Sequence, residues 1–339
     1  MRFGLAPVEE AIGAIAAHSV RADGTTVKKG TLISPEIAMQ LKQAGVETMI
    51  AARFEPGDVG EDEAAWRLAQ SLAGESVAVE APFTGRSNLY AAVSGVLLIG
   101  VDAINRLNAV DEAMTVATLP AYKPVILGEM VGTVKIIPYA IPEVLLQNGL
   151  VAVGRAALRV APYARSSVAV VSTVVPGLKP SVIEKTVTVL AQRLRPANAR
   201  IAQDCRVPHD PIALAQELSE LARGDAHLII VFGASAIADR RDIVPSAIEM
   251  AGGTVESFGM PVDPGNLLLV GSIAGKPVIG APGCARSPKE NGFDWILHRL
   301  LADIPVTRAD IKALGVGGLL MEIGSRPQPR EGGESEAEE

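Results

Sequence analysis

From Ser167 onward the sequence alternates between short apolar runs and segments that carry helix-start signals, and this alternation restricts the fold more than any other feature. The runs Ser167–Thr173 and His227–Phe232 are rich in β-branched residues, which is typical of strands buried inside a sheet. A third strand is predicted over Arg200–Cys205. Pro180 and the pair Asp210-Pro211 are placed to open the intervening helices. Strands separated by helices predict βαβ units and a mostly parallel sheet.

Residues 1–165 lack this alternation and predict a mixed α+β domain. Ser34-Pro35 opens a helix that runs to about Ala44, and Val46–Ala52 follows as a strand. Gly57–Asp62 is expected to be a turn, before a helix over Glu63–Leu72. The whole chain is therefore expected to be an α/β protein whose C-terminal domain has three layers. The predicted parts are a mixed domain (1–165), an α/β domain (166–306), an extension (307–324) and a disordered acidic tail (325–339).

The charge of the chain is concentrated at its C-terminal end. The net charge is −7, and residues 331–339 contain five glutamates and no basic residue. The rest of the chain is therefore nearly neutral and has no basic footprint for nucleic acid. Aromatic residues make up only 4% of the sequence, which disfavours surfaces that stack bases.

The sequence also disfavours a secreted or membrane-bound protein. Cys205 and Cys284 are the only cysteines, too few for a disulfide framework. The longest apolar run, Tyr90–Val101, is shorter than the roughly 20 residues that a spanning helix needs. We therefore expect a cytoplasmic protein that does not bind membranes.

A first candidate ligand-binding loop follows the predicted strand His227–Phe232. Gly233, Ala234 and Ser235 are small residues whose backbone N–H groups could approach an anion. Asp242 lies just before the next predicted helix, over Pro245–Ala251. A carboxylate beside a phosphate would be explained by Mg²⁺ between them. The alternative is that Asp242 only caps the helix.

A second candidate loop follows a short predicted strand that ends near Ile279. It contains a glycine-rich turn, two cations and a hydroxyl, and could cradle a phosphate. The alternative is a surface turn with solvated cations. The residues concerned are Gly280, Pro282, Gly283, Arg286, Ser287 and Lys289.

A third candidate segment is Val207–Asp210. Asp210 is expected to cap a helix, although it could also assist Asp242 with a metal ion. His209 is either a polar ligand or a residue that faces solvent. A zinc site with Cys205 is improbable because no further ligand lies nearby in the sequence.

Taken together, these loops resemble the domain shared by molybdopterin adenylyltransferase and molybdopterin molybdotransferase, of the molybdenum-cofactor biosynthesis family. Phe232–Ser235 occupies the position of the family's Gly-Gly-x-Ser/Thr loop, and Arg240–Pro245 resembles its Arg-Asp-Val-Thr-Pro run. Pro264-Gly265 matches the Pro-Gly turn. Gly280–Gly283, followed by Ser287, matches the run Gly-Leu-Pro-Gly-Asn-Pro-Val-Ser. The resemblance covers residues 166–303 well.

This resemblance implies a ligand and a set of roles. The ligand would be molybdopterin or its nucleotide. The loop after Phe232 would hold its phosphate, and Asp242 with Asp210 would be catalytic residues and ligands of Mg²⁺. Cofactor-binding residues would be Gly233, Ala234, Ser235, Pro264, Gly265, Gly280, Pro282, Gly283, Arg286 and Ser287. Relatives form oligomers and some are joined to a nucleotidyltransferase, so a homo-oligomer and a partner transferase are expected.

The resemblance leaves three functions open. The leading hypothesis is a molybdopterin-binding protein of cofactor biosynthesis or handling. The second is an active adenylyltransferase or molybdotransferase, and the third is a non-catalytic scaffold for a partner nucleotidyltransferase. Phe232, Asp263 and Cys284 depart from the Gly, Lys and Asn of the transferases, and His209 stands where the family has Asp. These departures favour binding over transfer.

Overall fold

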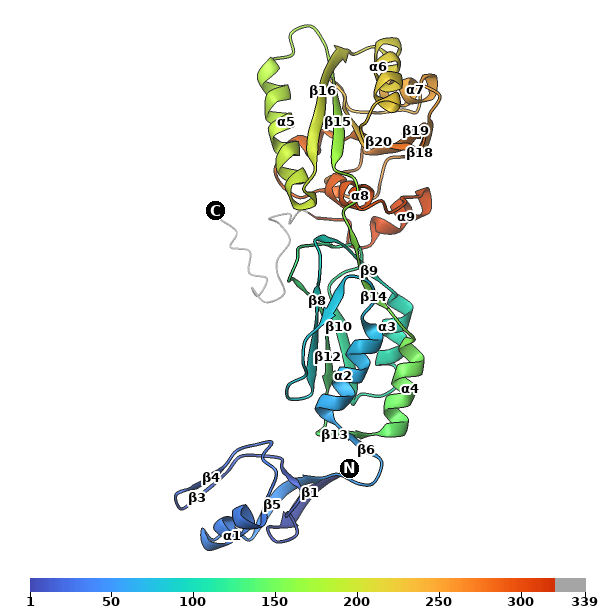
Figure 1. Ribbon diagram of the computed structural model, residues 1–339. Coiled ribbons are helices and arrows are strands. Elements are labelled where there is room, and N and C mark those ends of the chain that lie inside the picture. Colours follow the sequence, from blue (N-terminus) through green and yellow to red (C-terminus); the bar gives the residue numbers. More distant parts are fainter. Residues whose placement is uncertain (321–339) are drawn as a thin grey trace, which may run out of the picture. The chain divides into compact units, whose positions relative to one another are not determined.

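The computed structural model describes residues 1–320, and the predicted acidic tail lies outside the described residues. The chain divides into two compact units (Figure 1). The first comprises residues 1–93 and 97–160. The second comprises residues 94–96 and the chain from residue 161 onward.

The first 53 residues form a small antiparallel body. Its sheet has the order β1 (Arg2–Pro7), β5 (Thr48–Arg53) and β2 (Ile15–Ala16), and β3 (Val20–Ala22) pairs with β4 (Thr25–Val27). Helix α1 (Pro35–Gln43) begins where the sequence predicts, because the Ser34 hydroxyl accepts the N–H of Ile37 and Pro35 occupies the first turn. Leu41 and Met49 lie in a core made entirely within this body.

The rest of the first unit is built on an antiparallel sheet of four strands. Its order is β10 (Met114–Thr118), β12 (Met130–Ile136), β8 (Arg86–Ala91) and β7 (Val77–Val79). The remaining elements are α2 (Glu61–Leu72), β9 (Gly95–Ile99), α3 (Val101–Asn108), β11 (Pro124–Val125), α4 (Glu143–Val153) and β14 (Leu158–Pro162). Residues 95–96 of β9 and 161–162 of β14 are assigned to the second unit. The segment 57–62, which we expected to be a turn, contains strand β6 (Asp58–Gly60), because it finds a partner in β13 (Ala140–Pro142) far along the chain.

The second unit has the mostly parallel sheet that the alternating sequence predicts. The strand order is β16 (Arg200–Pro208), β15 (Ser167–Val174), β17 (Leu228–Phe232), β20 (Lys276–Ala281), β19 (Leu269–Ile273) and β18 (Thr254–Phe258). The first four strands are parallel, and β19 and β18 are antiparallel additions at one side. The α/β class is therefore confirmed.

Helices cover both faces of this sheet and complete three layers (Figure 1). Val168 and Val170 of β15 point into a core with α5 (Pro180–Leu194) and α8 (Gly292–Leu301). Ala169 and Val171 point into the opposite core, with α6 (Pro211–Arg223) and α7 (Ile243–Met250). Because side chains alternate along a strand, a central strand buried on both faces is apolar over most of its length, as β15 is from Val168 to Val171.

Two local details decide where the helices of this unit begin. The Asp210 carboxylate accepts the N–H groups of Ile212 and Ala213 and caps α6 as predicted. Helix α7 begins at Ile243, two residues earlier than predicted, because Asp242 rather than the proline is its cap. Pro245 is accommodated because the N–H groups of a first helical turn have no acceptor within the helix.

Two further observations concern the chain within residues 1–320. None of its helices has both the length and the apolar character needed to span a bilayer. Cys205 and Cys284 are both free thiols.

Candidate functional site

The candidate site lies where three parallel strands of the second unit reach their carboxyl ends. Strands β15, β16 and β17 end at Val174, Pro208 and Phe232, and β20 ends beside them because Phe232 pairs with Ala281. Open parallel sheets bind ligands at this edge. The loops after β17 and β20 therefore start at neighbouring positions, although they are about 50 residues apart in sequence.

Thr173, at the end of β15, organises the first loop. Its side chain is buried, and its Oγ1 accepts the backbone N–H of Ala234 at 2.8 Å. The same oxygen lies 2.8 Å from His209 Nδ1, and His209 Nε2 lies 2.9 Å from the Ser235 hydroxyl. Hydrogen bonds thus join three strand ends and bring Ala234 and Ser235 to one place.

Gly233 is required by this loop. A Cβ atom at residue 233 would lie 2.7 Å from the carbonyl oxygen of Ser235, a separation that backbone atoms do not tolerate. The glycine therefore permits a close turn of the chain directly after β17. Among the described residues, the N–H groups of Ser235, Ala236 and Ile237 donate to no protein acceptor. Ser235 and Ala236 are exposed, so their N–H groups are available to an anion, whereas Ile237 is buried.

Arg286 holds the two candidate loops together. It lies in the short 3₁₀ helix η2 (Gly283–Arg286) that follows β20. Its Nη2 donates to the Gly233 carbonyl at 2.9 Å and its Nη1 to the Thr186 hydroxyl at 2.8 Å, while its guanidinium lies 5.2 Å from the centre of the Phe232 ring. Burial lowers the pKa of Arg286, but an arginine remains charged. Its side chain is thus engaged by the protein, and its role is to fix the Gly233 loop against η2.

Asp242 and Asp210 are both engaged by backbone groups. Asp242 Oδ2 accepts the N–H of Ala238 at 3.0 Å and Oδ1 accepts that of Ile243 at 2.7 Å. Asp210 caps α6 in the same manner. Within residues 1–320, no three His, Cys, Asp or Glu residues come together as a metal site would need. The carboxylates of both residues thus cap helix starts, and Mg²⁺ coordination by Asp242 and Asp210 stays a prediction.

A pocket of about 560 Å³ lies beside η2 and forms the second part of the site. It contains Pro264 and Ser287, two of the predicted residues, together with the thiol of Cys284. Burial raises the pKa of that thiol, so it is a poor nucleophile. The other lining residues are Lys289, Glu290, Asn291 and Leu320.

Arg193 of α5 shapes the wall of this pocket. Its guanidinium donates to the carbonyls of Ala285 at 2.9 Å, Ser287 at 2.6 Å and Lys289 at 3.0 Å. Its Nε also donates to the carboxylate of Asp294 at 2.5 Å, and both side chains are nearly buried. One arginine thereby holds three carbonyl groups of the loop after β20.

The remaining predicted residues differ in how closely the protein packs around them. Gly265 allows close packing, because a Cβ there would lie 2.9 Å from the backbone of Gly292. Gly280 lies within β20, where a Cβ would meet Ile237 of the first loop at 2.8 Å. Pro282 precedes η2, and Gly283 differs from both glycines in having no heavy atom within 4 Å of its Cβ position.

Sequence reasoning missed Thr173, Thr186 and Arg193. Thr173 could have been predicted from the sequence, because it is a polar residue at the carboxyl end of a buried strand. Thr186 and Arg193 could not have been, since each lies on a helix where such residues usually face solvent.

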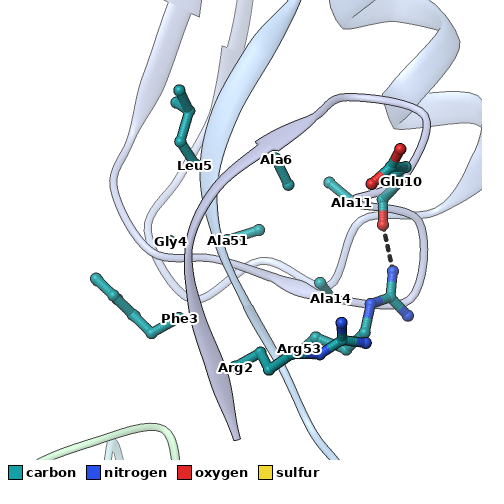
Figure 2. Close-up of a pocket in the computed structure, with 10 residues that line it drawn as sticks. All are labelled: Arg2, Phe3, Gly4, Leu5, Ala6, Glu10, Ala11, Ala14, Ala51 and Arg53. Atoms are coloured by element: carbon teal, nitrogen blue, oxygen red, sulfur yellow. Dashed lines mark hydrogen bonds between the residues drawn. The ribbon is translucent and has the colours of Figure 1, made fainter.

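A second pocket, of about 250 Å³, lies in the N-terminal body between β1, the following loop and β5 (Figure 2). Arg53 enters it and donates to the carbonyls of Glu10 and Ile12. No residue predicted from the sequence lines it. The Arg53 side chain thus holds the loop after β1.

Comparison with known proteins assigns two parts of the chain. A family model described as a probable molybdopterin binding domain matches residues 168–303. A model described as a domain of unknown function matches residues 5–53. No curated protein matches the sequence.

Two solved structures are similar to the chain at low identity. The molybdopterin biosynthesis MoeA protein from Pyrococcus horikosii is 15% identical, with 89% of this chain and 75% of that chain covered and a TM-score of 0.33. Molybdenum cofactor biosynthesis protein B is 14% identical, with 41% of this chain and 96% of that chain covered and a TM-score of 0.31. These values are too low to support an argument about function.

The second unit therefore contains a three-layer α/β domain, and its residues 168–303 are similar in sequence to a probable molybdopterin binding domain. The similarity to this molybdopterin-binding model is confined to residues 168–303 of the 339-residue chain.

Proposed function

We propose that the second unit binds a phosphorylated pterin, molybdopterin or its nucleotide, at the carboxyl edge of its sheet. The phosphate would bind to the N–H groups of the exposed residues Ser235 and Ala236. The pterin would lie toward the pocket that contains Ser287 and Cys284. Anion binding by backbone N–H groups at a loop beside a helix start requires no basic side chain, which agrees with the engagement of Arg286 elsewhere.

One observation carries this proposal. Arg286 connects the loop after β20 to the loop after β17 through the Gly233 carbonyl, so the two loops that resemble the family's ligand loops meet at one edge. The match of residues 168–303 to a molybdopterin-binding model supports the same ligand.

The positions at which this sequence differs from the transferases favour binding over group transfer. Phe232 is buried beneath Arg286, and the backbone of Asp263 is bonded to Gly318 and Leu320. Both positions are thus used to support the fold. An expected partner nucleotidyltransferase would supply the transfer chemistry.

Anaerobic titration with molybdopterin tests the proposal. Wild-type protein should bind saturably. Gly283→Ala should bind at least about 10-fold more weakly, because the added methyl meets only the ligand, a loss of about 1.4 kcal/mol. Gly4→Ala is the matched control, because residue 4 also has open space at its Cβ position and lies in the other unit. Absence of saturable binding, or equal affinity of Gly283→Ala and wild type, would overturn the proposal.

A further inference from the structure

The hydrogen-bonded line Thr173–His209–Ser235 has the arrangement of an activated serine. Ser235 Oγ lies 2.9 Å from His209 Nε2, and His209 Nδ1 lies 2.8 Å from Thr173 Oγ1. A hydroxyl nucleophile, a base within hydrogen-bond reach and a third group that orients the base are the parts that such a site requires.

The solvent exposure of these three side chains suits catalysis. Ser235 is exposed, His209 is half-buried, and Thr173 is 1% exposed. The nucleophile therefore faces an incoming ligand, while the orienting hydroxyl is held inside the fold. Thr173 is held in turn by the N–H of Ala234, so its oxygen cannot turn away from the histidine without losing that bond.

Backbone N–H groups that have no acceptor among the described residues lie in the same loop as Ser235, and those of Ser235 and Ala236 belong to exposed residues. The N–H groups of Ser235, Ala236 and Ile237 donate to no acceptor within residues 1–320. Donors beside a serine hydroxyl can stabilise an oxyanion that forms on the attacked group. The structure thus places nucleophile, base, orienting group and oxyanion donors on one loop and its two neighbouring strand ends.

We propose that Ser235 is a nucleophile activated by His209, that Thr173 positions the histidine, and that the group attacked is a phosphoryl centre of the bound ligand. The choice of a phosphoryl substrate rests on the proposed function, whereas the activation of Ser235 does not. His209 must carry its proton on Nδ1, donated to Thr173, so that Nε2 is free to accept the serine proton.

The step balances with water as its only further reactant. The Oγ–P bond forms and the bond from phosphorus to the leaving oxygen breaks. The serine proton moves to His209 Nε2 and from there to the leaving oxygen. Water then releases the phosphoryl group by the same route, and Ser235 is restored.

A fluorophosphonate probe tests the nucleophile without any pterin. The Ser235 Oγ–P bond would form as the P–F bond breaks, and the proton would pass to His209 while fluoride leaves. Intact-mass analysis of the full chain should show one adduct, which peptide mapping should place at Ser235. Ser235→Ala should abolish it, and Ser219→Ala is the matched control because its hydroxyl bonds only within α6.

Two conservative variants separate catalysis from support of the fold. His209→Gln keeps a donor toward Ser235 but cannot accept its proton, so labelling should slow by at least about 100-fold with an unchanged melting temperature. Thr173→Ser keeps the orienting hydroxyl and should label nearly as wild type, whereas Thr173→Val should not.

The outcomes discriminate between this inference and the proposed function. No adduct on wild-type protein, or an unchanged rate in His209→Gln, would overturn the activated serine. Labelling of Ser235 that molybdopterin does not slow would support the nucleophile while contradicting the proposed ligand. Molybdopterin binding without labelling would support the proposed function and overturn the activated serine.

Discussion

Two glycines of the candidate site, Gly233 and Gly283, have different physical roles. Gly233 and Gly283 both belong to glycine-containing loops that resemble the family's ligand loops. A side chain at residue 233 would collide with the backbone of its own loop, whereas a side chain at residue 283 would meet nothing within 4 Å. The first glycine is therefore required by the fold, whereas packing within the protein does not require the second.

Substitution of these glycines should separate the two roles. Gly233→Ala should lower the free energy of unfolding by about 1–3 kcal/mol, because the loop must shift to accommodate a methyl group. Gly283→Ala should change it by less than about 0.5 kcal/mol. Urea unfolding monitored by circular dichroism measures both, and a stable Gly233→Ala protein would contradict the collision.

A second prediction at this scale concerns acid stability of the first unit. Arg67 donates to both carboxylate oxygens of Glu143, at 2.8 and 2.7 Å, and with Gln147 it lowers the pKa of Glu143 from 4.5 to about 2. Because the folded pKa is depressed, the stabilisation is present above about pH 4.5 and is lost as the pH falls toward 2.

Melting temperatures of wild type and Glu143→Gln from pH 6 down to about pH 2 measure this contribution. The difference between the two proteins should be largest near neutral pH and should shrink as the carboxylate protonates. A difference independent of pH would show that the ion pair is not its source.

At the scale of elements, helix α5 determines the shape of the loop after β20. Arg193 reaches from α5 to three carbonyls of that loop and to Asp294 of α8. A short 3₁₀ helix such as η2 has few hydrogen bonds of its own. Its conformation, and with it the wall of the 560 Å³ pocket, thus depends on an arginine some 90 residues earlier in the chain.

Arg193→Met should destabilise the second unit by about 3–5 kcal/mol, because it leaves the nearly buried Asp294 without its partner. Adding Asp294→Asn should recover part of this loss, since the uncompensated charge is removed. Chemical denaturation of the two single variants and the double variant measures the coupling. Strictly additive losses would show that the pair is not coupled.

At the scale of the whole molecule, each hydrophobic core within residues 1–320 is made by residues of one unit. The cluster around Leu68 draws only on the first unit, and the cluster around Leu190 draws only on the second. Cores made within one unit predict units that unfold separately.

Paired core substitutions test this independence. Leu68→Ala and Leu190→Ala each remove a fully buried side chain and should each cost about 2–5 kcal/mol. Differential scanning calorimetry should show that each variant lowers a different transition. A single transition lowered equally by both would show that the chain unfolds as one cooperative body.

The sequence alone determined the class of the second unit and most of its element boundaries. Buried strands such as Ser167–Val174 are apolar on both faces, and helix starts such as Asp210-Pro211 depend on bonds to neighbours two or three residues away. The site was decided by tertiary structure. Thr173, His209 and Ser235 meet only because β15, β16 and β17 are adjacent in the sheet. Arg286 and Arg193 acquire their roles only when distant loops fold against them. Sequence patterns such as helix caps depend on hydrogen bonds between residues that are close in the chain. Contacts between residues far apart in the chain depend on strand order and loop conformation.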